Sequence, residues 1–246
     1  MTAAHSEPPA AGAGSTGAKA PLVSAMFTRI AGRYDLMNTL MTGGRHHAWR
    51  RLVARAAAAA PAGPVLDLAT GTADLALAIR EADPRRLVVG ADFAHGMLAQ
   101  AGAKLRERGA GRIPLVAADA LALPFPDHAF AAVTSAFLLR NLDDLDRGIR
   151  EMRRVTRPGG LVLTLDIVRP GVPVWGALFA LYFHRVVPAI GAVVARDRNA
   201  YTYLPDSVER FLTPAELARL MARVGLRDVG YRRLALGTIA VHTATA

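Results

Sequence analysis

VLDLATGTAD, residues 65–74, is the stretch that decides the fold of this chain. Its first part, Val65–Leu68, is a short apolar run typical of a buried strand. The small residues that follow predict a tight turn whose backbone can approach a ligand closely. A helix is expected over 73–80, with Thr72 as its N-cap. A buried strand that turns directly into a helix is the opening unit of a parallel α/β sheet.

The same alternation continues downstream of this unit. Strands are predicted at 87–91, 113–117, 131–135 and 161–167, and helices at 97–108 and 145–155. Repeated strand–helix–strand units form right-handed crossovers and place their strands in one parallel sheet. The predicted fold class is therefore α/β, with a doubly wound, mostly parallel sheet.

The C-terminal part predicts one more helix and a closing pair of strands. Thr213 is expected to be an N-cap, with Pro214 at the first helical position and Glu216 completing a capping box. Two alternating segments, 229–234 and 238–242, predict an antiparallel pair. With these two strands the predicted sheet has seven.

Two helices are expected before the first strand. One apolar stripe of helical spacing is formed by Phe27, Ile30, Tyr34, Met37 and Met41 and should end at Gly43-Gly44. A second helix is predicted over 45–60. Residues 1–21 are rich in Ala, Gly, Pro, Ser and Thr and predict a disordered tail without a secretory signal. Residues 22–246 are then expected to form a single domain.

The composition argues against several kinds of site. The 246 residues include no cysteine, which excludes disulfides, a thiolate nucleophile and cysteine-ligated zinc. Adjacent His46 and His47 are expected to point in different directions on a helix, so no metal site is predicted. The net charge of +10 comes almost entirely from arginine, since lysine occurs only at positions 19 and 104. Because the arginines are scattered, a composition bias is favoured over a nucleic-acid-binding surface.

Polar residues follow three successive predicted strands. In a doubly wound sheet, ligands bind beyond the carboxyl ends of the strands. A carboxylate at Asp92 can accept both hydroxyls of a ribose, and an oxygen at Asp119 can accept from an adenine amino group. The absence of a full G-x-G-x-x-G disfavours a dinucleotide, while turn and cap chemistry alone is the structural alternative. The predicted cofactor-binding residues are Asp67, Gly71, Thr72, Asp92, Phe93, Asp119 and Ala120.

Seven motifs follow one another through nearly all of the chain after the tail. They are FTRIAGRYDLMN (27–38), VLDLATGTADLAL (65–77), ADALALPFPDHAF (118–130), FLLRNLDD (137–144), EMRRVTRPGG (151–160), YTYLPDSVERF (201–211) and LGTIAVH (236–242). Together they resemble the menaquinone/ubiquinone biosynthesis C-methyltransferases. The resemblance implies the class I methyltransferase fold, S-adenosylmethionine as cofactor, and methyl transfer to a ring carbon of a prenylated quinol.

The resemblance also implies a substrate-facing cluster of Tyr34, Arg140 and Asn141. Arg140 is expected to stabilise a developing phenolate and Asn141 to orient an oxygen. Tyr34 or His46 is expected to relay a proton. The structural alternatives are a loop anchor between Arg140 and Asp143, a helix cap at Asn141, and core packing at Tyr34.

Four positions depart from the pattern of the family, namely Ala73, Ala131, Ala136 and Leu138, and two of them concern the cofactor. Ala73 stands where the family usually has Gly, and its methyl group is expected to point near the cofactor. Ala136 stands where a serine commonly contacts the cofactor. These departures leave open an accessory protein that binds S-adenosylmethionine without turnover. A small soluble aromatic or secondary metabolite is the alternative acceptor, and no nucleic-acid partner is expected because basic stripes with interleaved aromatics are missing.

An apolar insertion over 172–200 is expected to cover the substrate. Its aromatic and apolar residues are predicted to line a groove for the prenyl tail or to lie at a membrane surface: Trp175, Leu178, Phe179, Tyr182 and Phe183. Nearby Arg185, Arg196 and Arg198 suit anionic headgroups. A helix that closes the core is the alternative. Because charged residues and a proline interrupt the stretch, it should not span a membrane. We expect a cytoplasmic protein with peripheral contact at the inner face of the membrane.

Overall fold

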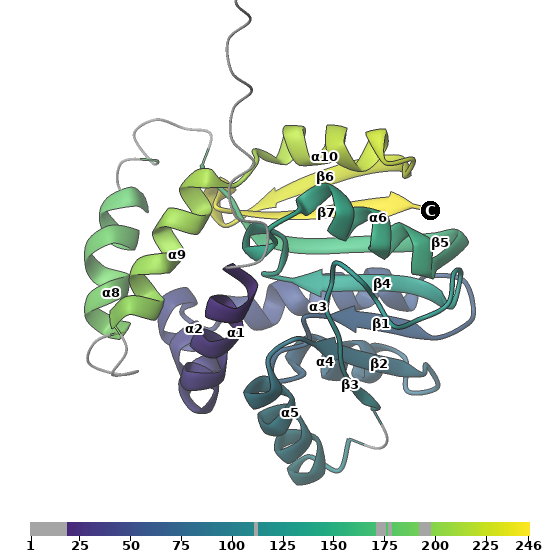
Figure 1. Ribbon diagram of the computed structural model, residues 1–246, viewed down its shortest axis with the longest axis horizontal. Helices are drawn as coiled ribbons and strands as arrows, with labels where there is room; N and C mark the ends of the chain where they lie inside the picture. The colour runs from purple at the N-terminus through teal and green to yellow at the C-terminus, as the bar shows by residue number, and fades with distance from the viewer. Residues whose placement is uncertain (1–18, 111–112, 171–175, 177–178, 192–197) are drawn as a thin grey trace, which may run out of the picture.

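A computed structural model describes residues 19–110, 113–170, 176, 179–191 and 198–246 of the protein. Within these ranges the chain forms a central sheet of seven strands (Figure 1). The strands are β1 (Val65–Leu68), β2 (Val88–Asp92), β3 (Leu115–Ala117), β4 (Phe130–Ala136), β5 (Thr156–Ile167), β6 (Arg227–Leu234) and β7 (Ile239–Thr245). Their order is β3-β2-β1-β4-β5-β7-β6, and β7 runs antiparallel to both of its neighbours. This sheet confirms the predicted doubly wound fold with its closing antiparallel pair.

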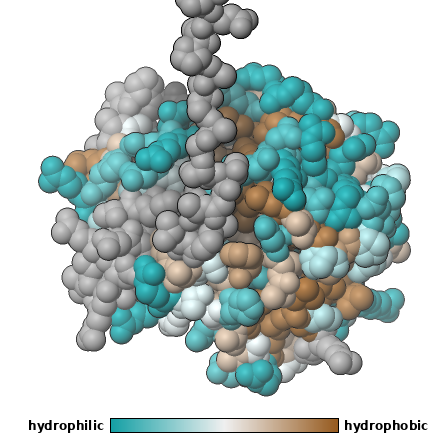
Figure 2. All heavy atoms as spheres, viewed as in Figure 1, coloured by the Kyte–Doolittle hydropathy of each residue, from teal (hydrophilic) through white to brown (hydrophobic). Residues whose placement is uncertain are grey.

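Helices cover both faces of the sheet. One face carries α3 (Arg45–Ala58), α4 (Asp74–Ala82) and α5 (His95–Glu107), and the other carries α6 (Leu145–Val155) and α10 (Pro214–Arg223). The side chains of β1 alternate accordingly, with Val65 in the first layer and Leu66 in the second. The outer surfaces of α6 and α10 are hydrophilic, as the upper right of Figure 2 shows.

The strand β5 begins earlier than the sequence predicts. A break was expected at 157–160, but β5 follows α6 without interruption from Thr156. The register explains the difference, because Phe130 pairs with Thr156 whereas Ala132 pairs with Leu161. The Pro-Gly-Gly segment is therefore an irregularity inside the strand and does not separate two elements.

The N-terminal helices differ from the predicted single stripe. A 3-10 turn, η1 (Ala31–Arg33), separates α1 (Lys19–Ile30) from α2 (Tyr34–Thr42). The left-handed Gly43 ends α2 as expected. The predicted tail ran to residue 21, but residues 19–21 belong to α1. The remainder of that tail, residues 1–18, lies outside the described residues.

A third hydrophobic cluster joins the N-terminal helices to the segment after β5 and forms a cap. After β5 the chain forms η3 (Tyr182–Val186), α8 (Val187–Ile190) and α9 (Arg198–Arg210). These pack against α1, α2 and α5 through residues that include Ile30, Met37, Met97, Phe183, Val187 and Val208. In Figure 1 the cap lies at the left, at the end of the sheet toward which β1 and β4 point. None of the helices in the described ranges combines the length and apolarity needed to cross a membrane.

Candidate active site

The loop after β1 is held in an unusual backbone conformation. Ala69, Gly71 and Ala73 have positive φ angles of 54°, 57° and 68°. This left-handed region costs an alanine about 1–2 kcal/mol, so the tight strand-to-helix turn is strained at two positions. Ala73 is the residue before α4 and takes the N-cap position, so the prediction of Thr72 as N-cap is wrong.

Two predicted contacts turn away from the end of the sheet. Thr72 is buried, and its hydroxyl donates to Asp35 Oδ1 at 2.6 Å. Ala73 is fully buried in the layer formed by α3, α4 and α5. Its methyl group was expected to point near the cofactor, but it packs in the hydrophobic core instead. Alanine in place of glycine at position 73 therefore adds backbone strain but no side-chain atom to the wall of the ligand site.

Asp92, the last residue of β2, holds this loop in place. Its Oδ2 accepts from the N–H of Gly71 at 2.8 Å, and its Oδ1 accepts from the N–H of Ala94 at 2.8 Å. These hydrogen bonds lower the pKa of the Asp92 carboxyl, but burial outweighs them and raises it above its usual value. Each carboxylate oxygen retains a further lone pair that a ligand hydroxyl can use.

A cavity of about 120 Å³, which we call the strand-end cavity, lies beyond the ends of β1 to β4. Five predicted cofactor residues line it, namely Gly71, Asp92, Phe93, Asp119 and Ala120. The Phe93 ring is 44% exposed and offers an apolar face to a flat ligand. Ala136 at the end of β4 also belongs to the wall. The strand order thus brings together residues that are far apart in sequence.

Asp67 lies beneath the strand-end cavity, outside its described walls. It is 1% exposed and accepts from the hydroxyls of Thr70 at 2.7 Å and Thr134 at 3.0 Å. Burial raises the pKa of Asp67 to about 6 in spite of these hydrogen bonds. In this position Asp67 holds Thr70 of the loop, and its direct contact with the ligand stays a prediction.

A larger cavity of about 480 Å³ adjoins the first, and we call it the apolar cavity. Most of its wall is apolar or aromatic and includes Met26, Ile30, Met41, Trp49, Ile167, Phe179, Phe183, Leu204 and Leu236. Phe27, Tyr34, Phe137 and Asn141 line both cavities. The helix α1 contributes to both walls. Its Ser24 lines only the strand-end cavity, and its Met26 lines only the apolar cavity.

Arg140 lies in the wall of the apolar cavity, on η2 (Leu139–Asn141). Its Nη1 donates to Asp166 Oδ1 at 2.5 Å, with side-chain exposures of 6% and 2%. Within the described structure, Arg140 Nε and Asp166 Oδ2 have no hydrogen-bond partner. Arg140 is thus paired with Asp166 and not with Asp143. Sequence reasoning missed Asp166, although an acidic residue in a buried strand is a recognisable signal.

In the wall that the two cavities share, Phe137 and Asn141 are joined by a hydrogen bond, and the backbone of Phe137 is strained. Asn141 Nδ2 donates to the carbonyl of Phe137 at 3.0 Å. Phe137 has a φ of 64°, and the guanidinium carbon of Arg140 lies 5.7 Å from its ring centroid. The N-cap of α6 is Asp144, which accepts from Arg147 N–H at 2.9 Å, so Asn141 is not that cap.

His46 lies outside the described walls of both cavities. It is fully buried on α3, with Nε2 at 3.2 Å from the Thr39 hydroxyl and Nδ1 hydrogen-bonded to Arg50. Burial, together with Arg50 and His47, lowers the pKa of His46 to about 4. The described walls of the two cavities do not include His46, and its role as a proton relay stays a prediction.

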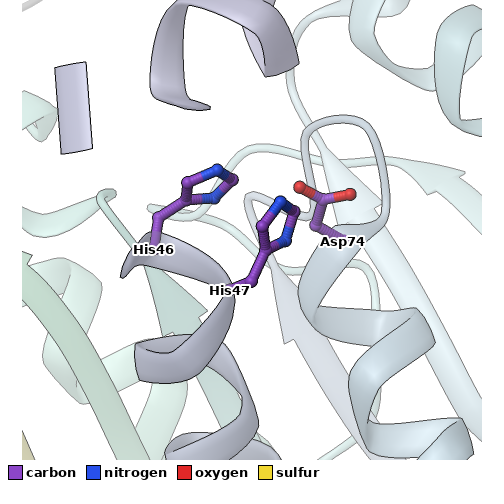
Figure 3. Close-up of side chains that lie close together, drawn as sticks. All are labelled: His46, His47 and Asp74. Carbon is purple, nitrogen blue, oxygen red and sulfur yellow. The ribbon is translucent and has the colours of Figure 1, made fainter. Parts of the chain in front are cut away.

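His46, His47 and Asp74 come together beside the loop, as Figure 3 shows. The two rings lie 3.9 Å apart, so the prediction that they point in different directions is wrong. Asp74 Oδ2 is 3.2 Å from Arg50 Nη1, and its Oδ1 is 2.7 Å from Lys104 Nζ. Burial alone would raise the pKa of Asp74, but these cations outweigh it and lower that pKa. Two cations on the carboxylate would repel a metal ion, which favours an ion-pair network.

Comparison with known sequences places this site in a family context. The model of the ubiE/COQ5 methyltransferase family matches residues 15–246. A demethylmenaquinone methyltransferase from Thermus thermophilus is 45% identical, with 88% of this chain and 98% of the relative covered. Another from Roseiflexus castenholzii is 43% identical, with coverages of 92% and 93%. A ubiquinone/menaquinone biosynthesis C-methyltransferase UbiE from Desulfotalea psychrophila is 43% identical, with coverages of 91% and 90%.

Solved structures share the fold at low sequence identity. The [4+2]-cyclase SpnF superposes with a TM-score of 0.69 at 19% identity, covering 92% of this chain and 96% of its own. A SAM-dependent methyltransferase from Thermotoga maritima, described as a possible histamine N-methyltransferase, gives a TM-score of 0.61 at 18% identity, with coverages of 91% and 99%. At these identities the likeness concerns the fold alone.

Proposed function

The chain belongs to the ubiE/COQ5 methyltransferase family, and from this premise we propose that it transfers a methyl group from S-adenosylmethionine to a ring carbon of a prenylated quinol, either demethylmenaquinol or a ubiquinol precursor. The observation that carries this proposal is the contact between the strand-end cavity and the apolar cavity, which share four wall residues. A reaction between a nucleoside-bearing donor and a lipid-tailed acceptor needs two such compartments in contact.

The strand-end cavity has the chemistry to hold S-adenosylmethionine. Asp92 offers a buried carboxylate to the ribose hydroxyls, and Phe93 offers an exposed ring to the adenine. Asp119 and Ala120 line the same cavity, and we assign recognition of the adenine amino group to them. When bound, this cofactor supplies a methyl group on a positively charged sulfur.

The wall of the apolar cavity supplies the groups that prepare the acceptor. A quinol ring carbon becomes nucleophilic when the neighbouring hydroxyl loses its proton. The buried guanidinium of Arg140 favours the phenolate of an acceptor held beside it. Asn141, in the shared wall, orients an acceptor oxygen, and Tyr34 relays the proton.

The insertion is proposed to cover the prenyl tail, within a single domain over 22–246. Phe179, Tyr182 and Phe183 line the apolar cavity as this role requires, and the Tyr182 hydroxyl donates to the carbonyl of Met41 at 2.9 Å. Trp175 and Leu178, which the same prediction included, lie outside the described residues, as does Arg196. The cavity volume of about 480 Å³ lies in the range of sites that enclose drug-sized ligands.

We further propose a cytoplasmic enzyme whose cap touches the inner face of the membrane. Four large apolar side chains of the cap region are exposed, namely Leu36, Leu40, Leu181 and Val186. Leu236, in the turn before β7, is 73% exposed and also lines the apolar cavity, so this cavity reaches the surface. Exposed apolar side chains of this kind suit a lipid surface that delivers a prenylated substrate. The variant Leu181→Ser/Val186→Ser should cosediment less with anionic vesicles while methylating detergent-dispersed quinol normally.

The decisive experiment combines cofactor binding with product analysis. Purified protein is titrated calorimetrically with S-adenosylmethionine, and demethylmenaquinol in detergent is then added and examined by mass spectrometry. Binding with a C-methylated product supports the proposal. Binding without product contradicts this acceptor and directs the search to other quinols, small phenols or an accessory role. Absence of binding contradicts the cofactor assignment itself.

A further inference from the structure

The side chain of Lys104, on α5, ends among three oxygen atoms from three other segments. Its Nζ donates to Asp74 Oδ1 at 2.7 Å, to Thr72 Oγ1 at 3.0 Å and to the carboxylate of Asp35. The Lys104 side chain is only 16% exposed. An ammonium group has three N–H donors, and here each has an acceptor.

The choice of lysine at this position is itself informative. Lysine occurs only at positions 19 and 104, among 30 basic Lys and Arg residues in the chain. A guanidinium presents its donors in one plane, whereas an ammonium directs them toward the corners of a tetrahedron. The acceptors around Lys104 come from α2, the loop after β1 and the start of α4. A tetrahedral ammonium suits acceptors that come from three directions, in keeping with the exception to the bias toward arginine.

This network joins the neighbours of two wall residues. Asp35 follows Tyr34 in α2, and Thr72 follows Gly71 in the loop. Thr72 Oγ1 donates to Asp35 Oδ1 at 2.6 Å, so both oxygens of the Asp35 carboxylate are held. A Cβ atom on Gly71 would lie 3.9 Å from Cε1 of Tyr34, so the Tyr34 ring already lies against the loop.

We propose that Lys104 is a positioning residue that couples the strand-end cavity to the apolar cavity. This inference rests on the proposed function. A donor in the strand-end cavity fixes the loop at Gly71, and Lys104 transmits that order to Asp35 and so to Tyr34 in the wall of the apolar cavity. Donor binding therefore prepares the acceptor site, and by linkage acceptor binding strengthens donor binding to the same extent.

The test measures this coupling directly. Affinity for a short-tailed demethylmenaquinol is measured with and without saturating S-adenosylhomocysteine in the wild type, Lys104→Met, Lys104→Arg and the control Arg106→Met. Arg106 is an exposed residue of the same helix. We expect S-adenosylhomocysteine to tighten quinol binding about fivefold or more in the wild type and the control. Both Lys104 variants should reduce that factor below about twofold, and kcat/KM by about 10- to 100-fold.

The outcomes separate positioning from simple stabilisation. A lower melting temperature with the coupling factor retained in Lys104→Met overturns the inference, as does a wild type without coupling. Rescue by Lys104→Arg also overturns it, because the argument requires an ammonium. If Lys104→Met fails to fold, Asp35→Asn/Lys104→Met restores the charge balance and should show the same loss of coupling. Failure of the wild type to bind S-adenosylhomocysteine contradicts the proposed function, and this inference with it.

Discussion

The strand-end cavity and the apolar cavity are built in different ways. The first is formed largely by residues that directly follow β1, β2, β3 and β4, and backbone hydrogen bonds such as that between Gly71 and Asp92 fix its shape. The second is formed mainly by helices and turns, with the ends of β5 and β7 at Ile167 and Ile239, and much of it belongs to the hydrophobic cluster of the cap. Sheet topology therefore determines the donor site, whereas tertiary packing determines the acceptor site.

The largest expected effect breaks the acceptor site alone. In Arg140→Ala, kcat for the quinol should fall about 100- to 1,000-fold, because a preorganised cation beside the phenolate is lost. The affinity for S-adenosylhomocysteine, measured by calorimetry, should not change. In Arg140→Ala the Asp166 carboxylate, 2% exposed, is left without its cation. The control Arg140→Ala/Asp166→Asn removes this buried charge and should show the same loss of kcat. Turnover near the wild-type value would refute the role of Arg140.

A second effect concerns the support beneath the strand-end cavity. Burial raises the pKa of Asp67 from 3.8 to about 6, so the folded protein binds this proton more tightly than the unfolded chain. Its favourable contribution to the free energy of unfolding is full below about pH 4 and is lost as the pH rises through 6. The difference between wild type and Asp67→Asn in urea unfolding should change by about 2–3 kcal/mol over this range. A pH-independent difference would contradict the shift.

Next in size is a change that breaks the donor site alone. Asp92→Asn removes a charged acceptor from the loop and from the ribose position. We expect the affinity for S-adenosylhomocysteine to fall about 10- to 100-fold, as charge-assisted hydrogen bonds are lost. Binding of a short-tailed quinol without the donor should remain as in the wild type. Equal losses for both ligands would show that the two cavities are not separable in this way.

The smallest expected effect sharpens the donor site. Ala136→Ser adds a hydroxyl to the wall of the strand-end cavity at the end of β4. One new hydrogen bond should tighten S-adenosylmethionine binding about two- to tenfold. The matched control is Ala132→Ser, a fully buried position of the same strand outside the described cavity walls. Weaker binding in Ala136→Ser would show that the cofactor does not meet this position.

The same contrast separates what could be predicted from the sequence. The sheet and most donor-site residues were predictable, because Gly71, Asp92 and Asp119 each follow a strand with a clear apolar signature. Sequence motifs alone supplied Arg140 and Asn141 through the family resemblance, and the structure places both in the walls.

Other features depended on directions that a local pattern does not contain. Thr72 and His46 were assigned to the site, but their side chains turn into the ion-pair network around Asp74. Asp166 was missed because its partner lies on a separate turn after β4. The left-handed φ of Phe137 could not be predicted from the sequence, because aromatic residues rarely adopt that conformation.

The helix α1 contributes residues to both cavities, and this shared wall has a kinetic consequence. Enclosed sites for drug-sized ligands measure about 300–1,000 Å³, and the strand-end cavity, at about 120 Å³, is smaller than these. At Gly96 a Cβ atom would lie 2.6 Å from Thr28 Cγ2, so α1 rests on α5 where α5 has no side chain. Because α1 lines both cavities, a displacement of α1 from α5 would expose both to water at the same time. Lid displacements in enzymes take microseconds to milliseconds, and where such a step limits the rate, a faster chemical step does not raise turnover.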